Sequence, residues 1–189
     1  DRCLAFYVKF AEIAEEHIRG RARVTWIHRL ESEQDNLRAA MKWGLARRPE
    51  NALRIAASLP LYWTTGGFSA EGFRWIQEAV VKYIEKMGEV EQPSLRAKGL
   101  IGLAFLYMSL GDNINGKRAA EESVALFRQN QAQGGLAYAL FILAFPLEFL
   151  GELLQAEAAL LESVAIARSE KNAFVLASAL NNLTRVTLN

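Results

Sequence analysis

The sequence predicts an all-α protein, a right-handed solenoid of antiparallel helical hairpins with about nine helices. Apolar residues recur at spacings of three and four along nearly the whole chain, and Ala, Leu, Glu, Arg and Gln dominate it. Between the turn signals, no stretch alternates apolar and polar residues as a strand does. One segment returns after 40 residues, and a fixed period of this size is typical of helical repeat architectures.

The repeat is clearest in the second helix of each predicted hairpin. GDNINGKRAAEESVALFR, residues 111–128, returns as GELLQAEAALLESVAIAR, residues 151–168. The helical segment before each of them repeats in the same register, so that Leu100 corresponds to Leu140. A third copy begins with Leu180 near the end of the chain. We therefore expect the hairpins to stack, each one contacting its neighbours.

Short breaks separate the predicted helices. They fall at Gly20, Arg48-Pro49, Gly66-Gly67, Gly88 to Pro93, Gly111 to Asn113, Gln131 to Gly135, Gly151 and Lys171-Asn172. We expect one domain over residues 1–189, in which residues 1–48 form an N-terminal helical pair and residues 49–189 form the repeats, the last one truncated. Because the chain starts at Asp1 without a Met and ends inside a helical pattern, we expect it to be a fragment of a longer protein.

Small residues follow each turn glycine at fixed distances, five positions after it and again seven positions further on. Small side chains at these places let two helix backbones approach closely. The pairs are Gly72 and Ala79, Gly116 and Ser123, and Ala156 and Ser163. With the apolar first helix, this pattern resembles the tetratricopeptide (TPR) repeat, whose usual period is about 34 residues. The spacings of 44 and 40 residues here imply longer helices or loops.

A longer motif carries a more specific resemblance. WIHRLESEQDNLRAAMKWGLA, residues 26–46, resembles the segment that opens the TPR region of large bacterial STAND-type regulatory ATPases, which often carry LuxR-type or related winged-helix DNA-binding domains. GGFSAEGFRWIQEAV, residues 66–80, is similar to the next repeat of that region. The resemblance implies a regulator of signalling or transcription in which this chain is a C-terminal sensor or interaction region. The ATPase and DNA-binding domains would lie in parts absent from this chain.

The stretch GDNINGKR, residues 111–118, differs by one residue from the phosphate-binding motif G-x-x-x-x-G-K-[ST]. A phosphate loop follows a strand and places a Ser or Thr after the lysine for magnesium. Here a helical pattern precedes the stretch, and Arg118 takes the Ser/Thr position. The repeated copy of the stretch contains nothing that would hold a phosphate. We predict a turn between two helices, without nucleotide binding or any other cofactor.

The charge balance and the apolar pattern limit the kinds of partner that the chain could bind. The 22 basic and 21 acidic residues give a net charge of +1, which provides no electrostatic footprint for nucleic acid or an anionic membrane. The longest apolar run, residues 136–147, is too short to span a bilayer and contains Pro146, which should bend a buried helix. The single cysteine, Cys3, excludes an internal disulfide and fits a reducing compartment, so we expect a cytoplasmic location.

Residues that could carry chemistry do not form a catalytic or metal-binding constellation. The two histidines, His17 and His28, stand in no metal-ligand spacing, and Cys3 has no candidate base nearby in the sequence. The acidic run at residues 31–35 is interpreted as a helix face that pairs with Arg38 rather than as a general acid and base. We therefore expect no enzymatic activity and no metal.

The first helices of the repeats carry the candidate binding site, because the TPR resemblance implies that they line the concave face of the solenoid. This face would suit an apolar segment with an acidic or polar flank, supplied by a protein or peptide partner or by another domain of the parent protein. The chain would then be a non-enzymatic sensor or protein-interaction module. The predicted groove residues are Lys98, Ile101, Phe105, Met108, Tyr138, Phe141, Phe145, Glu148, Asn181 and Arg185.

Two alternatives stand beside this interpretation. As the second interpretation, the aromatic face of Phe105, Phe141 and Phe145 would form an apolar pocket for a small effector or a lipid. The same side chains would also suit internal packing against a helix or domain that is absent from this chain.

Overall fold

The computed structural model describes residues 2–88 and 92–188, and these residues form eleven α-helices without a strand. The helices are α1 (Arg2–Ile18), α2 (Arg23–Ser32), α3 (Gln34–Arg47), α4 (Pro49–Ser58), α5 (Pro60–Thr65), α6 (Ser69–Met87), α7 (Pro93–Ser109), α8 (Asn113–Gln129), α9 (Gln133–Phe149), α10 (Leu153–Ser169) and α11 (Ala173–Thr187). The all-α prediction is confirmed. None of the described helices has the length and apolar content to cross a membrane.

The structure contains two more helices than the sequence predicts. Where a pair was predicted over residues 1–48, the described residues 2–48 form three helices, because the chain turns at Glu33, whose φ of −102° and ψ of 7° interrupt the helix. The helix expected after Pro49 is divided into α4 and α5 at Pro60. Pro60 lacks an N–H, and its ring disfavours helical geometry at Leu59, which has φ −110° and ψ 10°.

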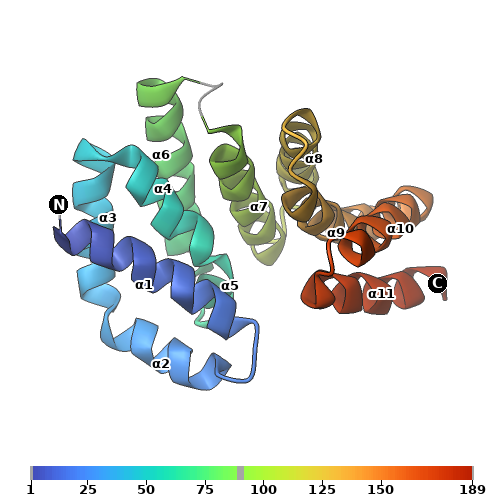
Figure 1. Ribbon diagram of the computed structural model, residues 1–189, viewed down its shortest axis with the longest axis horizontal. Helices are drawn as coiled ribbons and strands as arrows, with labels where there is room; N and C mark the ends of the chain where they lie inside the picture. Colours follow the sequence, from blue (N-terminus) through green and yellow to red (C-terminus); the bar gives the residue numbers. More distant parts are fainter. Residues whose placement is uncertain (1, 89–91, 189) are drawn as a thin grey trace.

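The helices form two layers that run the length of the molecule (Figure 1). Within one layer, α1 packs on α4, α4 on α7, α7 on α9 and α9 on α11. The second layer consists of α3, α6, α8 and α10, each of which packs against its neighbours in the first. Figure 1 shows the resulting arc, with α1 and α2 at one end and α10 and α11 at the other. The first helix of every hairpin therefore lies in the same layer.

Equivalent buried hydrogen bonds show that the 40-residue repeat is structural. The Ser123 hydroxyl donates to the carbonyl oxygen of Ala97 at 2.9 Å, and the Ser163 hydroxyl donates to that of Ala137 at 2.7 Å. Both serines are fully buried between the two helices of their hairpin. The sequence predicted small residues at these positions, and the structure adds that their hydroxyls tie the second helix to the first.

The turns repeat as well. Gly111 and Gly151, which end the first helices of two hairpins, have φ of +83° and +78°. Their following residues donate backbone hydrogen bonds back to Tyr107 and Leu147, at 2.9 and 2.8 Å. A positive φ closes the end of a helix and is most easily adopted by glycine. The prediction that Gly111 and Gly151 occupy equivalent turns is thus confirmed.

The predicted small positions coincide with close helix contacts. A Cβ atom on Gly72 would lie 2.4 Å from the Trp63 ring, and one on Gly116 would lie 3.3 Å from the carbonyl oxygen of Ala104. Larger side chains there would force the paired helices apart. The second helix of each hairpin is therefore held close against the first, and the side chains on the opposite face of the first helix remain for other contacts.

Candidate functional site

A cavity of about 770 Å³ lies where the C-terminal end of α1 meets the first helices α7, α9 and α11. Its wall is largely apolar and includes six aromatic rings from four different helices. These rings belong to Phe105, Phe127, Tyr138, Phe141, Phe145 and Phe174. The cavity is thus built mainly by the layer of first helices (α1, α4, α7, α9 and α11), which we call the inner layer, with Phe127 added from α8. The end of α1 and the α4–α5 junction close its N-terminal side.

The aromatic wall is densest on α9. Tyr138, Phe141 and Phe145 are spaced by three and four residues, which puts them on one face of the helix. The ring centroids of Phe141 and Phe145 are 5.1 Å apart in an edge-to-face arrangement, and those of Tyr138 and Phe141 are 6.1 Å apart. All three side chains are half-buried, so each ring keeps an accessible surface facing the cavity.

Polar groups cluster at one side of the cavity around Lys98. Its ammonium nitrogen lies 2.5 Å from Oε2 of Glu15 and 3.1 Å from the hydroxyl oxygen of Ser58, which is buried. The other oxygen of Glu15, Oε1, accepts from the Arg19 guanidinium at 2.8 Å. One carboxylate therefore pairs with two cations, and only together with Glu16, which also lines the cavity, do the charged lining residues sum to zero.

Arg19 also connects the two ends of the inner layer. Its guanidinium lies 4.6 Å from the ring centroid of Tyr138 on α9 and 5.5 Å from that of Phe174 on α11. Such cation–π contacts contribute roughly 0.5–1 kcal/mol each at exposed sites. Burial raises the pKa of the Tyr138 hydroxyl, against a smaller opposing effect of Arg19, so the ring stays neutral at physiological pH. The Arg19 side chain thereby links the end of α1 to α9 and α11.

The structure brings six of the ten predicted groove residues to this cavity: Lys98, Ile101, Phe105, Tyr138, Phe141 and Phe145. Ile101 is almost fully buried and contributes little accessible surface. The other four, Met108, Glu148, Asn181 and Arg185, do not line it. The carboxylate of Glu148 accepts from the Arg185 guanidinium, which lies 5.9 Å from the Phe145 ring centroid.

These ion pairs change the predicted chemistry of the groove. The sequence placed Lys98 and Arg185 at its edges as partners for an acidic flank. In the structure, Glu15 pairs with Lys98 and Glu148 pairs with Arg185. A ligand carboxylate would have to compete with these internal partners, so the attraction comes chiefly from the aromatic wall. That any partner binds here stays a prediction.

The other residues that line the cavity were not predicted from the sequence, and four of them make the polar and aromatic contacts described above. Glu15 and Arg19 come from the end of α1, Ser58 from the end of α4, and Phe174 from the start of α11. Their helices are far apart in the chain, and helical periodicity describes only neighbours a few residues away. The Arg19-Gly20 helix end was visible in the sequence, but nothing in it indicated contact with α9 and α11.

The residues of the near-miss phosphate motif serve the junction between two hairpins. Asp112 caps α8 by accepting from the backbone N–H of Asn115 at 3.1 Å. The ammonium group of Lys117 donates to both carboxylate oxygens of Glu152, at 2.8 and 2.6 Å. Glu152 is the N-cap of α10, so this pair joins the N-terminal part of α8 to the start of α10, the second helices of two successive repeats.

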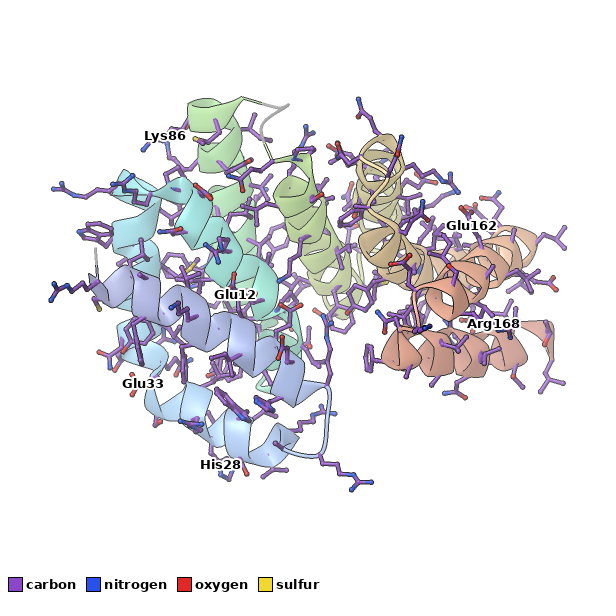
Figure 2. All side chains as sticks on the ribbon, viewed as in Figure 1. Glu12, His28, Glu33, Lys86, Glu162 and Arg168 are labelled. Carbon is purple, nitrogen blue, oxygen red and sulfur yellow. The ribbon has the colours of Figure 1, made fainter. Side chains whose placement is uncertain are left out.

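The acidic run at residues 31–35 also makes structural contacts. Glu33 accepts from the Tyr7 hydroxyl at 2.7 Å and from the Asn36 side chain at 2.8 Å, which together lower its pKa. Asp35 pairs with Arg38 at 3.1 Å. Figure 2 shows Glu33 at the end of α2 and His28 on the outer side of that helix. No group of three or more potential metal ligands occurs in the described ranges.

The fold and the cavity define a helical-repeat protein. The family described as "ANAPC5: Anaphase-promoting complex subunit 5" matches residues 73–145 and again residues 130–188, which together make up more than half of the chain. The chain therefore belongs to this family. The match covers the hairpins from α6 onward and includes α9, which carries the densest part of the aromatic wall.

A solved structure supports the same fold. The crystal structure of BtubC (BKLC) from P. vanneervenii aligns with a TM-score of 0.61 and 12% sequence identity, covering 99% of this chain and 90% of that chain. At this identity the likeness concerns the fold alone. No curated protein matches the chain. The comparisons agree with the helical-repeat part of the resemblance, whereas its STAND-type and LuxR-type context is not among their findings.

Proposed function

We propose that the chain is a non-enzymatic protein-interaction module that binds a polypeptide segment in the aromatic cavity of its inner layer. The observation that carries this proposal is the half-buried aromatic row of α9 facing a cavity of about 770 Å³. The segment belongs either to a separate protein or to another domain of the parent protein. Family membership supports contacts with proteins, because the family is described by the name of a subunit of a complex.

The physical basis is the burial of apolar surface by a partner. Aromatic side chains in desolvated pockets carry a large share of binding energy at protein interfaces. An apolar helix that presents side chains at spacings of three and four would fit the facing rings of Tyr138, Phe141 and Phe145. Glu15 and Glu16 together balance the charges of Lys98 and Arg19, so the partner's apolar residues dominate affinity, while its polar residues determine orientation.

The wider context is part of the same proposal. The resemblance of residues 26–46 to the opening of the TPR region in STAND-type ATPases supports a sensor role in a cytoplasmic bacterial regulator of signalling or transcription. Occupation of the groove would favour one of two states of the parent protein. An enzymatic role is not proposed, because the acidic run and the Lys117 turn already have structural partners.

Selection from a displayed library of random 16-residue peptides on the immobilised chain tests the proposal. We expect enriched peptides to carry Leu, Phe or Trp at helical spacing, and a Phe141→Ala chain to retain them poorly. The matched control is Phe6→Ala, an exposed aromatic on α1 outside the cavity, which should retain them fully. Equal retention by both variants, or no enrichment over an unrelated helical protein, would sink the proposal.

A second candidate is a small-molecule or lipid-binding domain, favoured by the cavity volume, which lies within the roughly 300–1,000 Å³ of small-ligand sites. Calorimetric titration with dodecanoate and with dodecanol separates this candidate from the first. Saturable binding of either probe, lost in Phe141→Ala and unaccompanied by peptide enrichment, would favour the small ligand.

A further inference from the structure

The helix α11 leaves open a face that its repeat equivalents cover. In the 40-residue register Leu180 corresponds to Leu140 on α9 and to Leu100 on α7. Leu140 is 2% exposed and Leu100 is 6% exposed, whereas Leu180 is 40% exposed. The chemistry of the position is unchanged, so the difference arises from what lies against the helix.

The open face extends along the helix. Ala177, Leu180, Thr184 and Thr187 are exposed and follow one another by three or four residues, which places them on one side of α11. Their equivalents on α9 are all buried: Ala137, Leu140, Ala144 and Leu147. In α7 and α9 this side is covered by the second helix of the same hairpin, α8 or α10.

The exposure is not a sign of a loosely packed helix. Ala179, Asn182 and Val186 lie on the other side of α11 and are buried, because α11 packs on α9 and α10. A half-buried Leu183 lies beside the open face. The helix is therefore fixed in position, and its remaining side is left uncovered by the described residues.

The two complete hairpins show what such a partner must carry. The Ser123 hydroxyl of α8 donates to the Ala97 carbonyl, and the Ser163 hydroxyl of α10 donates to the Ala137 carbonyl. Ala177 is the third member of this series. Seven residues before Ser123, Gly116 lies against the Ala104 carbonyl, so the covering helix runs antiparallel to the one it covers.

We propose that the face formed by Ala177, Leu180, Thr184 and Thr187 is a docking site for an antiparallel helix with a small residue opposite Thr184 and a serine seven residues later, opposite Ala177. Thr184 replaces the alanine of the other two repeats, and its larger side chain makes Gly or Ala the suitable residue across from it. This site lies on another side of α11 from the aromatic cavity and does not depend on the groove binding anything.

The test supplies this helix from the chain itself. Residues 150–170, which contain α10 with Ala156 and Ser163, are appended directly after Asn189, where the 40-residue register would place them. We expect the extended chain to unfold at a Tm several degrees above that of the 189-residue chain, with more helix by circular dichroism. An extension in which the appended copy carries Ala156→Glu and Ser163→Glu is the matched control and should give no increase.

Leu180→Glu identifies the surface used. Because Leu180 is exposed, this change should alter the Tm of the 189-residue chain little, yet abolish the increase in the extended chain. An extension without effect on Tm, or a Leu180→Glu loss equal in both chains, would overturn the proposal. Sedimentation of the 189-residue chain tests whether a second copy of the chain binds this face instead. A dimer that is lost in Leu180→Glu would assign the face to that second copy and contradict the helix proposed here.

Discussion

Tyr62 shows how a single buried atom affects this fold. Its side chain is 1% exposed, and its hydroxyl has no hydrogen-bond partner among the described residues. Burial raises the pKa of this hydroxyl to about 12. A buried hydroxyl without a partner loses its hydration and gains nothing in return, at a cost of about 1–3 kcal/mol. The ring itself fills the junction between α5 and its neighbours and is stabilising.

We therefore expect Tyr62→Phe to leave the free energy of unfolding unchanged or to raise it by up to about 1 kcal/mol. Urea denaturation measures the effect. The matched control is Tyr7→Phe, which removes a hydroxyl that donates to Glu33 at 2.7 Å and should lower the free energy of unfolding by about 0.5–1.5 kcal/mol. A loss in Tyr62→Phe as large as that in Tyr7→Phe would show that the hydroxyl is partnered in solution.

The Arg38–Glu71 pair predicts a pH dependence. The Arg38 guanidinium donates to both oxygens of Glu71, at 2.6 and 2.7 Å, and joins α3 to α6. This pairing, assisted by the Trp75 indole, holds the pKa of Glu71 below its usual value of 4.5, against the opposing effect of burial. A carboxylate with a lowered folded-state pKa stabilises the fold above its unfolded-state pKa, and the contribution is lost as pH falls through the folded-state value.

Glu71→Gln should accordingly be less stable than the unmutated chain near neutral pH. The difference in free energy of unfolding should shrink as the pH is lowered from about 6 toward 3, because the carboxylate becomes protonated. Urea denaturation at several pH values measures it. Glu78→Gln, an exposed carboxylate on the same helix, is the control. A difference that stays constant with pH would mean that Glu71 acts through packing alone.

At the scale of elements, the sequence predicted those helices and turns that are determined by interactions within one repeat. The hairpins from α6 onward were predicted because their apolar periodicity, turn glycines and small residues all lie within one repeat. The divisions at Glu33 and Pro60 were missed, because apolar spacing continues across both breaks and outweighed the proline signal. Pro146 has a different outcome: α9 runs through it without ending, since packing on α7 and α10 supports the helix. A bend there stays a prediction.

The turns between hairpins predict a stabilising substitution. Gln131 and Lys171 end α8 and α10 with φ of 54° and 56°, a conformation that costs a side-chain-bearing residue roughly 1 kcal/mol. Lys171→Gly removes this strain and should raise the free energy of unfolding by about 0.5–1 kcal/mol, measured by thermal or urea denaturation. Gly151→Ala introduces the same strain at φ +78° and should lower stability by a similar amount. A destabilising Lys171→Gly would contradict the argument.

At the scale of the whole molecule, the repeat period predicted that the hairpins stack, but not that the end of α1 closes one side of the cavity. Residues 40 apart lie on equivalent faces of adjacent hairpins, so Phe105 and Phe145 were expected near one another, and both line the cavity. The end of α1 reaches the same cavity through Arg19, which contacts Tyr138 and Phe174. Those contacts join residues more than a hundred positions apart, and no periodicity in the sequence encodes them. On the polar side of the site, Lys98 was predicted, whereas Glu15, Arg19 and Ser58 were not, for the same reason.

The last prediction concerns the cavity and tests whether Phe141 and Phe145 form a binding surface or belong to the hydrophobic core. Phe141 and Phe145 are half-buried, whereas Phe127, which also borders the cavity, is only 5% exposed. Truncating a ring removes the contacts that it makes in the free protein, so the exposed portion does not contribute to stability. We expect Phe127→Ala to lower the free energy of unfolding by about 3–5 kcal/mol, and Phe141→Ala or Phe145→Ala by clearly less.

We expect peptide affinity to depend on Phe141 and Phe145, the two rings whose truncation costs less stability than that of Phe127. Peptides enriched on the unmutated chain should bind Phe141→Ala and Phe145→Ala at least about tenfold more weakly, the loss expected when an aromatic anchor worth about 1.4 kcal/mol or more is removed. Fluorescence titration measures affinity, and urea denaturation of the same samples measures stability. If Phe141→Ala and Phe145→Ala instead destabilise the chain as much as Phe127→Ala does, these rings belong to the core. The aromatic row of α9 would then fill space between helices, and binding would have to be sought elsewhere on the inner layer.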